Sequence, residues 1–311
     1  MAKSSSKLGI SSESTISKYD QLADIIARYT TDSGEDRTAI SGLILSKKET
    51  PSRPLYLAQW PCIAMVIQGA KSVTLGQDVF QYGVGDYLLV SLDLPVISQV
   101  TRASKTEPNL GIGMEIKPER LNQLLSRITL PEQTLKMNEI RGVAVNKASP
   151  EILDATVRLL RLLDRPENIE AMAPLIEQEI LYYILMGPYG RQLLRFAQED
   201  APGNKIAKAI TWLRDHYHET LKIKVLADVV SMSESSLHGH FKSATSMTPM
   251  QYQKQLRLHE ARKLMLVNGL DASEAGFRVG YQSPAQFSRE YSRLYGNSPL
   301  RDVAVLRKHI H

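Results

Sequence analysis

Two groups of residues with the same spacing lie in the last third of this 311-residue chain, and both have the composition of a helix that reads DNA. The repeated residues are Ser233, Leu237, Phe241 and Pro249, followed fifty positions later by Ser283, Phe287, Tyr291 and Pro299. In each copy a Ser that can cap a helix is followed four and eight positions later by apolar residues that bury one face. The opposite faces carry Ser235, Ser236, His238, Gly239 and Lys242 in the first copy, and Ala285, Gln286, Ser288, Arg289, Ser292 and Arg293 in the second. Short or polar side chains of this kind allow a helix to enter the major groove and contact base edges.

Each copy is preceded by a short amphipathic segment that can support it. These segments lie around 225–230 and 275–279, with turns at Ser231-Met232 and at Gly280-Tyr281-Gln282. A short helix, a turn and a second buried helix form a helix-turn-helix unit. The segment 251–266 between the units has an apolar stripe, and we expect a linking helix that holds the two readers about one DNA turn, roughly 34 Å, apart. A helical bundle with accidental self-similarity is the alternative.

The positive charge is concentrated in the same part of the chain. Residues 203–311 contain 16 Lys and Arg against 9 Asp and Glu, a net charge of +7, whereas residues 1–202 contain 22 against 24, a net charge of −2. All seven histidines lie at or after His216. This asymmetry predicts a basic binding module attached to a near-neutral one. Charge alone leaves open the alternative of a solvated basic surface with no partner.

The first two thirds of the chain have the pattern of an antiparallel β domain flanked by helices. Between 38 and 116, short runs rich in Val, Ile, Leu and Tyr are separated by Gly and Pro, which predicts a sandwich or barrel with room for a small ligand. Helical spacing predicts helices over 16–30, 118–128, 150–164 and 172–186. The last two of these either complete the core of the β domain or form a dimer interface. The Ser-rich residues 1–15 predict a disordered tail, and the polar residues 198–204 predict a linker.

The C-terminal repeat resembles the AraC/XylS family of transcription regulators. The resemblance lies in LADVVSMSESSLHGHFKSATSMTP (226–249), RLHEARKLML (257–266) and EAGFRVGYQSPAQFSREYSRLYGNSP (274–299). The segments CIAMVIQGAKSVTLG, YLLVSLDLPV and LIEQEILYYILMGP are similar to the cupin-like N-terminal domain of one subgroup of this family. The resemblance implies an α+β protein. Residues 16–197 would form a cupin-like β-barrel with flanking helices, and residues 205–305 an all-α domain of two helix-turn-helix units joined by a linker helix.

The resemblance also assigns base contacts within the recognition helices 234–244 and 284–294. They fall on Ser235, His238 and Gly239 in the first helix, and on Pro284, Ala285, Ser288 and Arg289 in the second. Arg289 is the main candidate, because Arg can donate two hydrogen bonds to guanine, which contributes about 1–3 kcal/mol of discrimination. A phosphate contact or a plain surface charge is the alternative for Arg289. Gly239 departs from the family, which often has a long polar side chain there, so we expect the first unit to read fewer bases and His238 or Lys242 to contribute more.

The residues available for catalysis are few. Residues 1–215 contain no histidine, so the β domain lacks the ligands of a metal-binding cupin and the base of a Ser-His-Asp or Cys-His mechanism. The chain also lacks the Gly-rich motifs that bind nucleotide phosphates. We therefore expect no metal, no cofactor and no enzymatic activity. The contending classes are a cupin-type enzyme or small-molecule binding protein with an incidental basic tail, and a nonspecific architectural DNA binder.

Cys62 is the single cysteine, so no intrachain disulfide can form. It is either a sensor of oxidants or electrophiles or an inert buried thiol. No segment resembles a secretory signal or is apolar over the length needed to cross a bilayer, which predicts a cytoplasmic protein without a membrane partner. The resemblance implies four partners, namely double-stranded DNA, a second copy of the chain in a homodimer, RNA polymerase, and an unidentified small-molecule effector bound by the N-terminal domain.

Overall fold

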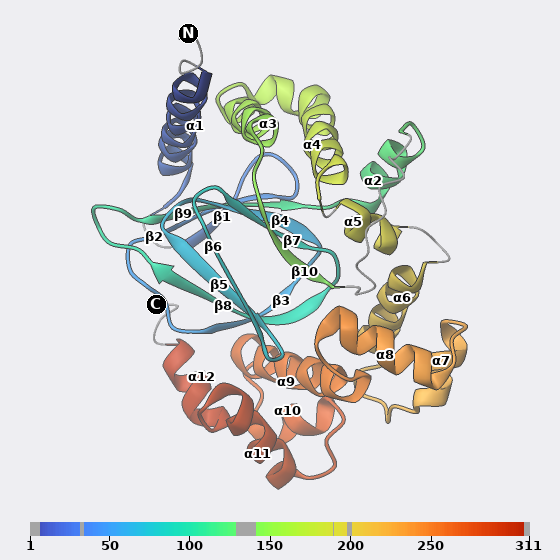
Figure 1. The fold of residues 1–311 in the computed structure, drawn as a ribbon. Coiled ribbons are helices and arrows are strands. Elements are labelled where there is room, and N and C mark those ends of the chain that lie inside the picture. Colours follow the sequence, from blue (N-terminus) through green and yellow to red (C-terminus); the bar gives the residue numbers. More distant parts are fainter. Residues whose placement is uncertain (1–6, 32–33, 129–140, 189, 198–200, 308–311) are drawn as a thin grey trace.

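The computed structural model describes residues 7–31, 34–128, 141–188, 190–197 and 201–307, which form a two-sheet β domain with helices on two sides (Figure 1). The six-stranded sheet consists, in spatial order, of β1 (Gly34–Arg37), β2 (Leu43–Lys48), β9 (Asn109–Glu115), β4 (Cys62–Gln68), β7 (Asp86–Val90) and β10 (Val143–Lys147). The four-stranded sheet consists of β3 (Leu55–Gln59), β8 (Leu94–Arg102), β5 (Ala70–Leu75) and β6 (Asp78–Gly83). The described strands pair antiparallel, which confirms the predicted α+β, cupin-like architecture. They form two separate sheets rather than one closed barrel.

Both faces of the inner strands β9, β4 and β7 of the six-stranded sheet are buried, which accounts for their apolar sequences. In β4, Ile63, Met65 and Ile67 belong to the core on the helix side, whereas Cys62 and Val66 belong to the core on the opposite side. Successive side chains of a strand point to opposite faces, so neighbouring residues of β4 pack into different cores. The structure thereby shows which side chains of β4 face the helices and which face the second sheet, a choice that the sequence pattern does not determine.

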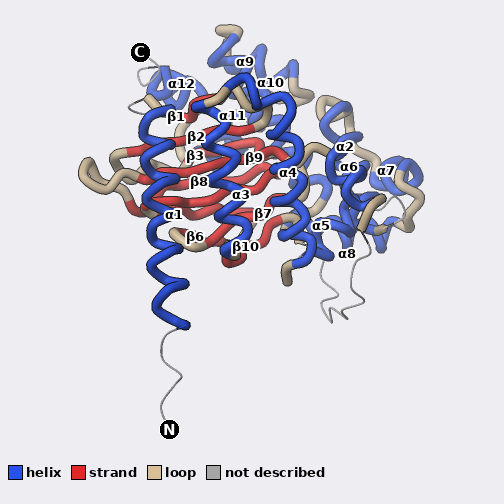
Figure 2. Tube along the Cα trace, turned by 90° about the horizontal axis from the view of Figure 1, so that it is seen from above, coloured by secondary structure: helices blue, strands red, loops and turns tan. Residues whose placement is uncertain are grey.

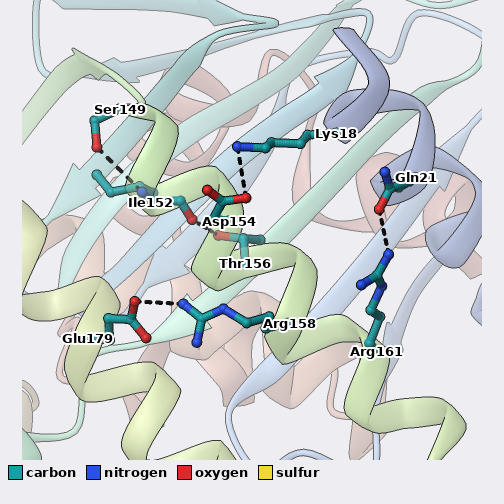
Figure 3. Close-up of polar contacts among 9 residues, drawn as sticks. All are labelled: Lys18, Gln21, Ser149, Ile152, Asp154, Thr156, Arg158, Arg161 and Glu179. Carbon is teal, nitrogen blue, oxygen red and sulfur yellow. Dashed lines mark hydrogen bonds and ion pairs between the residues drawn. The ribbon is translucent and has the colours of Figure 1, made fainter. Parts of the chain in front are cut away.

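Three helices cover the outer face of the six-stranded sheet (Figure 2), namely α1 (Lys7–Tyr29), α3 (Pro150–Arg161) and α4 (Ile169–Met186). Polar contacts join α3 to both neighbours (Figure 3). The contacts are Lys18 Nζ to Asp154 Oδ1 at 2.7 Å, Arg161 Nη2 to Gln21 Oε1 at 2.7 Å, and Arg158 Nη2 to Glu179 Oε1 at 2.6 Å. Beyond α3 lie the short 3-10 turns Leu162–Asp164 and Pro166–Asn168, and α2 (Pro118–Leu125) and α5 (Gly190–Ala197) contact α4.

Two boundaries differ from the sequence-based expectation. Helix α1 begins at Lys7, so residues 7–15, expected in a disordered tail, are helical. Burial of Leu22 and Ile26 stabilises the rest of this helix, and extending an existing helix costs much less than starting one. Helix α6 (Pro202–Asp215) begins inside the segment 198–204 expected as a linker, because proline is favourable at the first helical position. Residues 1–6 and 198–200 lie outside the described residues.

The C-terminal part is helical, as predicted. After α6 its described helices are α7 (Ile223–Val229), α8 (Glu234–Thr245), α9 (Pro249–Val267), α10 (Ala272–Arg278), α11 (Pro284–Tyr295) and α12 (Pro299–Arg307). The predicted recognition helices 234–244 and 284–294 correspond to α8 and α11, and each extends one residue further. The predicted linking helix corresponds to α9.

Helix α9 contributes to the cores of both helix-turn-helix units. Tyr252 belongs to the first core, where its ring contacts the Phe241 ring edge-on with 5.5 Å between centroids. Leu258, Ala261 and Met265, the predicted apolar stripe, belong to the second core. One helix therefore determines where both units lie.

A buried ion pair joins α9 to α12 beside α11. Arg262 donates from Nε and Nη2 to the carboxylate oxygens of Asp302 at 2.8 and 3.0 Å. Tyr291 donates to Oδ2 of the same carboxylate at 2.7 Å, and the guanidinium of Arg262 lies 4.2 Å from the centroid of the Tyr295 ring. The side chains of Arg262 and Asp302 are only 16% and 9% exposed. Removing one partner of such a pair leaves an uncompensated buried charge.

Replacing Arg262 with Met should destabilise the second helix-turn-helix unit by about 3 kcal/mol, because Asp302 would keep its charge without its cation. Arg278→Met is the matched control, since its ion pair with Glu274 is 61% and 49% exposed and pairs of that kind contribute about 0–1 kcal/mol. Thermal unfolding followed by circular dichroism compares both variants with the parent chain. Equal melting temperatures for the two variants would contradict this role of the buried pair.

Candidate nucleic-acid interface

The first candidate recognition helix, α8, is defined by a cap at each end and by one buried face. Ser233 Oγ accepts a hydrogen bond from the Ser236 amide at 3.2 Å. Ser246 ends the helix in the left-handed conformation, with φ of 55°. The buried residues are Leu237, Phe241, Ala244 and Thr245. Burial at this spacing leaves the other side of α8 available to a partner.

Most of the residues predicted to read bases from α8 lie on that available side. Those that are exposed are Ser235, His238, Gly239 and Lys242. Ser236 and His240 are partly buried. A carbon atom added at Gly239 has no neighbouring atom within 4 Å, so no packing constraint explains the glycine.

The second candidate recognition helix, α11, begins in the way the sequence predicted. Ser283 Oγ accepts a hydrogen bond from the Gln286 amide at 3.4 Å, and Pro284 occupies the first helical position. Phe287, Tyr291 and Tyr295 form its buried aromatic face. The predicted contact residues that are exposed are Pro284, Ala285, Gln286, Arg289 and Arg293, while Ser288 is partly buried.

Arg289 is an exposed cation on α11 that is free to bind a ligand. Within the described part of the chain its guanidinium group forms no hydrogen bond or ion pair. The neighbouring Glu290 accepts hydrogen bonds from Tyr281 Oη at 2.8 Å and from Gln286 Nε2 at 3.4 Å. The side-chain amide of Gln286 therefore already donates one hydrogen bond within the protein, whereas Arg289 retains all five N–H donors for a base or a phosphate.

Arg257, in the middle of α9, joins the two units through backbone carbonyl groups. Its Nε donates to Tyr217 O at 2.6 Å and its Nη2 to Glu219 O at 2.7 Å, in the loop before the first unit. Its Nη1 donates to Gly280 O at 3.2 Å, in the turn of the second unit. Gly280 has φ of 93°, and an added carbon would lie 2.1 Å from His218 O, so only glycine fits this turn. The sequence did not single out Arg257, because its acceptors lie in distant segments.

The turn between β5 and β6 contacts the first unit (Figure 1). Ser246 Oγ donates to Asp78 Oδ2 at 2.6 Å, and Gly142 N donates to Ala244 O at 2.8 Å. A groove of about 870 Å³ lies between this turn and helices α8, α9 and α11. The charged residues that line it are Asp78, Arg141, Lys242, Lys254, Glu290 and Arg293. Two predicted DNA contacts, Lys242 and Arg293, thus line the groove that separates the helices from the β domain.

A smaller cavity of about 110 Å³ lies between the two sheets, and Cys62 lines it. The thiol is 2% exposed and lies 3.2 Å from Gln59 Nε2, and burial raises its pKa to about 12. Because the thiolate is the reactive form, this pKa favours an inert thiol over a sensor of oxidants or electrophiles. Lys71 and Tyr82 line the same cavity, although no local signal in the sequence marks them as cavity residues. A lysine at the start of a strand is usually exposed, and only the pairing of the two sheets shows otherwise.

The carboxylates of α4 that face other helices have structural partners. Glu177 is buried and pairs with Arg120, and Glu179 pairs with Arg158 at 2.6 Å. Within the described ranges, no group of three or more His, Cys, Asp or Glu side chains is placed to hold a metal ion. None of the helices described has the length and apolar character needed to cross a membrane.

Comparison with known families matches both halves of the chain. Residues 39–192 match the family described as the AraC-type transcriptional regulator N-terminus, and residues 226–302 match a helix-turn-helix domain family. The transcriptional activator RhaS from Salmonella agona is 29% identical over 160 residues, which cover 50% of this chain and 56% of RhaS. The chain therefore spans about half the length of the curated relatives it matches.

Solved structures of ToxT from Vibrio cholerae share the fold. An apo variant aligns with a TM-score of 0.54 and 10% identity over 86% of this chain and 98% of ToxT. The wild-type protein bound to an unsaturated fatty acid aligns with a TM-score of 0.53 and 10% identity, over 84% and 93% of the two chains. The order of a β domain and a double helix-turn-helix domain is thus common to both proteins. From these matches and its fold, the chain belongs to the AraC/XylS family of transcription regulators.

Proposed function

We propose that this protein is a sequence-specific DNA-binding transcription regulator in which α8 and α11 read two adjacent segments of the major groove. The observation that carries the proposal is that two capped helices with exposed polar faces are held by one shared helix. The 19 residues of α9 span about 28 Å at 1.5 Å per residue. That length is close to the roughly 34 Å between successive major-groove segments on one side of a duplex.

The two helices have different roles in this proposal. The contacts fall on Ser235, Ser236, His238, Gly239 and Lys242 of α8, and on Pro284, Ala285, Gln286, Ser288, Arg289 and Arg293 of α11. Arg289 reads a guanine, because its donors are free and exposed. The Lys and Arg side chains around it supply the salt-dependent attraction to phosphates.

The N-terminal part has a sensory role in this proposal. Residues 16–197 bind a small-molecule effector and residues 205–305 bind DNA, with 198–204 between them. The structure of ToxT bound to an unsaturated fatty acid supports ligand binding by a protein of this fold, although that ligand is ToxT's own. Family membership further supports RNA polymerase as a partner and a cytoplasmic location.

Two contending functions have less support. A cupin-type enzyme needs a metal site or a catalytic base, and the part of the β domain that is described contains no histidine. An architectural binder bends DNA without reading its sequence and has no need of two helices at a fixed separation. We therefore propose a role other than that of an enzyme.

We also propose a homodimer that forms through the outer face of α4. Met172, Leu175 and Tyr182 lie at helical spacing and are 43%, 58% and 38% exposed. Exposed apolar side chains along one helix face are typical of an interaction surface. Other residues of α4 pack onto α3, so this helix both completes the core and presents a surface.

Selection and sequencing of genomic fragments bound by the full-length protein tests the DNA-binding proposal. We expect one enriched site with two short sequence blocks about one helical turn apart. Arg289→Ala should weaken the preference at one block only, by about 1–3 kcal/mol at a single base pair. Arg301→Ala, an exposed Arg on α12, removes an equal charge and should leave both preferences intact. The absence of any enriched site would contradict the proposal.

Replacing Leu175 with Glu should dissociate the homodimer, because it places a charge at the most exposed apolar position of α4. Light scattering coupled to size-exclusion chromatography measures the mass of the 34.8 kDa chain and of its assemblies. Val267→Glu is the control, since Val267 is exposed in the DNA-binding part. A parent protein that is monomeric, or a Leu175→Glu variant that remains dimeric, would exclude this interface.

A further inference from the structure

The cavity between the two sheets exists because one of its walls is built from small residues. Gly111 and Gly113 of β9, Cys62 and Ala64 of β4, and Ser46 of β2 line it from the six-stranded sheet. A carbon atom added at Gly113 would meet nothing nearer than Ile44 Cβ at 3.9 Å. Protein cores are normally packed without voids of this size, so alternate small residues on neighbouring strands indicate a space that is kept open.

The other wall brings polar groups to the same space. Lys71 of β5, Tyr82 of β6 and Ser98 of β8 line the cavity from the four-stranded sheet. Within the described residues, the side-chain polar atoms of these three residues and of Ser46 form no hydrogen bond with the protein. Tyr82 and Ser98 are 5% and 9% exposed, whereas Lys71 and Ser46 are only partly buried. These four side chains therefore keep polar groups that can bind a ligand in this cavity.

One cation and one carboxylate line the cavity, Lys71 and Glu35. The ammonium group of Lys71 has no carboxylate within ion-pair distance among the described residues. Desolvation lowers the pKa of Lys71, Glu35 and the Cys62 thiol raise it, and the nearby Lys48 lowers it. Glu35 lies on the edge strand β1 and is exposed to solvent, which weakens its attraction for Lys71. An anion bound at Nζ would compensate the cation where Glu35 does not.

We propose that this cavity is the effector site and that it takes a short-chain monocarboxylate. The carboxylate accepts hydrogen bonds from Lys71 and Tyr82, and the alkyl chain lies against the apolar lining of Leu57, Val73 and Leu88. The inference deepens the proposed function, on which it rests, by naming the chemical class of the regulator's ligand.

The size of the cavity restricts the length of the acid. A cavity of about 150 Å³ holds benzene, which has six non-hydrogen atoms, so one of about 110 Å³ accommodates at most about six. Butanoate lies at this upper limit, whereas a long-chain fatty acid does not fit. A second carboxylate would lie without a partner in the apolar part, and an amine would be repelled by Lys71.

Calorimetric titration of the full-length protein with butanoate tests the proposal, with butanamide and decanoate as comparison ligands. We expect one saturable site per chain for butanoate and at least tenfold weaker binding of butanamide, which has the same shape without the charge. Decanoate should not bind at this site, because its chain is too long.

Two variants identify the site. Lys71→Met keeps the length of the side chain without the charge and should weaken butanoate binding at least tenfold, whereas Lys105→Met, an exposed loop lysine, should not change it. Gly113→Val fills the cavity from the opposite wall and should abolish binding while the melting temperature remains close to that of the parent. Absence of saturable butanoate binding, or equal affinities of the parent and Lys71→Met, would overturn the proposal.

The butanoate-binding experiment and the DNA-selection experiment can fail independently of each other. A protein that selects a DNA site but does not bind butanoate would refute the ligand class and leave the regulator intact. A protein that binds butanoate through Lys71 but enriches no DNA site would refute the regulator and leave the cavity as a carboxylate site.

Discussion

The geometry of the DNA-binding part depends on one constraint, which is that α9 belongs to two cores at once. Tyr252 and Leu258 are six residues apart, which rotates the helix by a net angle of about 240°, so the two cores occupy different faces of α9. Tyr252 is 1% exposed and Leu258 2% exposed, and displacing either unit would expose apolar surface at a cost of about 25 cal/mol per Å². Arg257 lies between them and bonds to carbonyl groups on both sides. The separation of α8 and α11 is therefore set by the protein before any DNA is bound.

The same helix also connects the first unit to the β domain. Tyr252 Oη donates to Asp93 O at 2.6 Å, and Arg214 pairs with the Asp93 carboxylate at 3.2 Å. Strand β5 has Lys71 in the cavity near one end and leads at its other end into the turn that bonds to Ser246, at the C-terminus of α8. Gly76, the first residue of that turn, is five positions after Lys71, a distance of about 16 Å along the strand. One continuous strand therefore joins the lining of the cavity to the contact with α8.

Local chemistry explains which elements could be predicted from the sequence. Helices α8 and α11 were predicted to within a residue because capping serines and apolar residues at steps of four specify a helix without reference to the rest of the chain. Pro202 was assigned to a linker, but it is the first residue of α6. Proline is common both in linkers and at the first position of a helix, so the residue type alone does not distinguish the two. The phase of β4 and the place of Lys71 could not be predicted, because they depend on which strands pair. The contact between Asp78 and Ser246 joins residues 168 positions apart, and no local signal precedes it.

The two recognition helices differ in how much base information they can supply. On α11, Arg289 is exposed, and a bidentate contact to guanine requires a planar donor group of this kind. On α8, the corresponding side offers hydroxyl groups, His238 and Gly239, and a glycine has no side chain to contact a base edge. The open space around Gly239 shows that packing does not prevent a larger side chain at this position. The groove beside the β5–β6 turn borders both helices, since Gly239 and Lys242 of α8 and Arg293 of α11 line it. The unit with the weaker base-reading chemistry is therefore the one whose C-terminal end is bonded to the β domain.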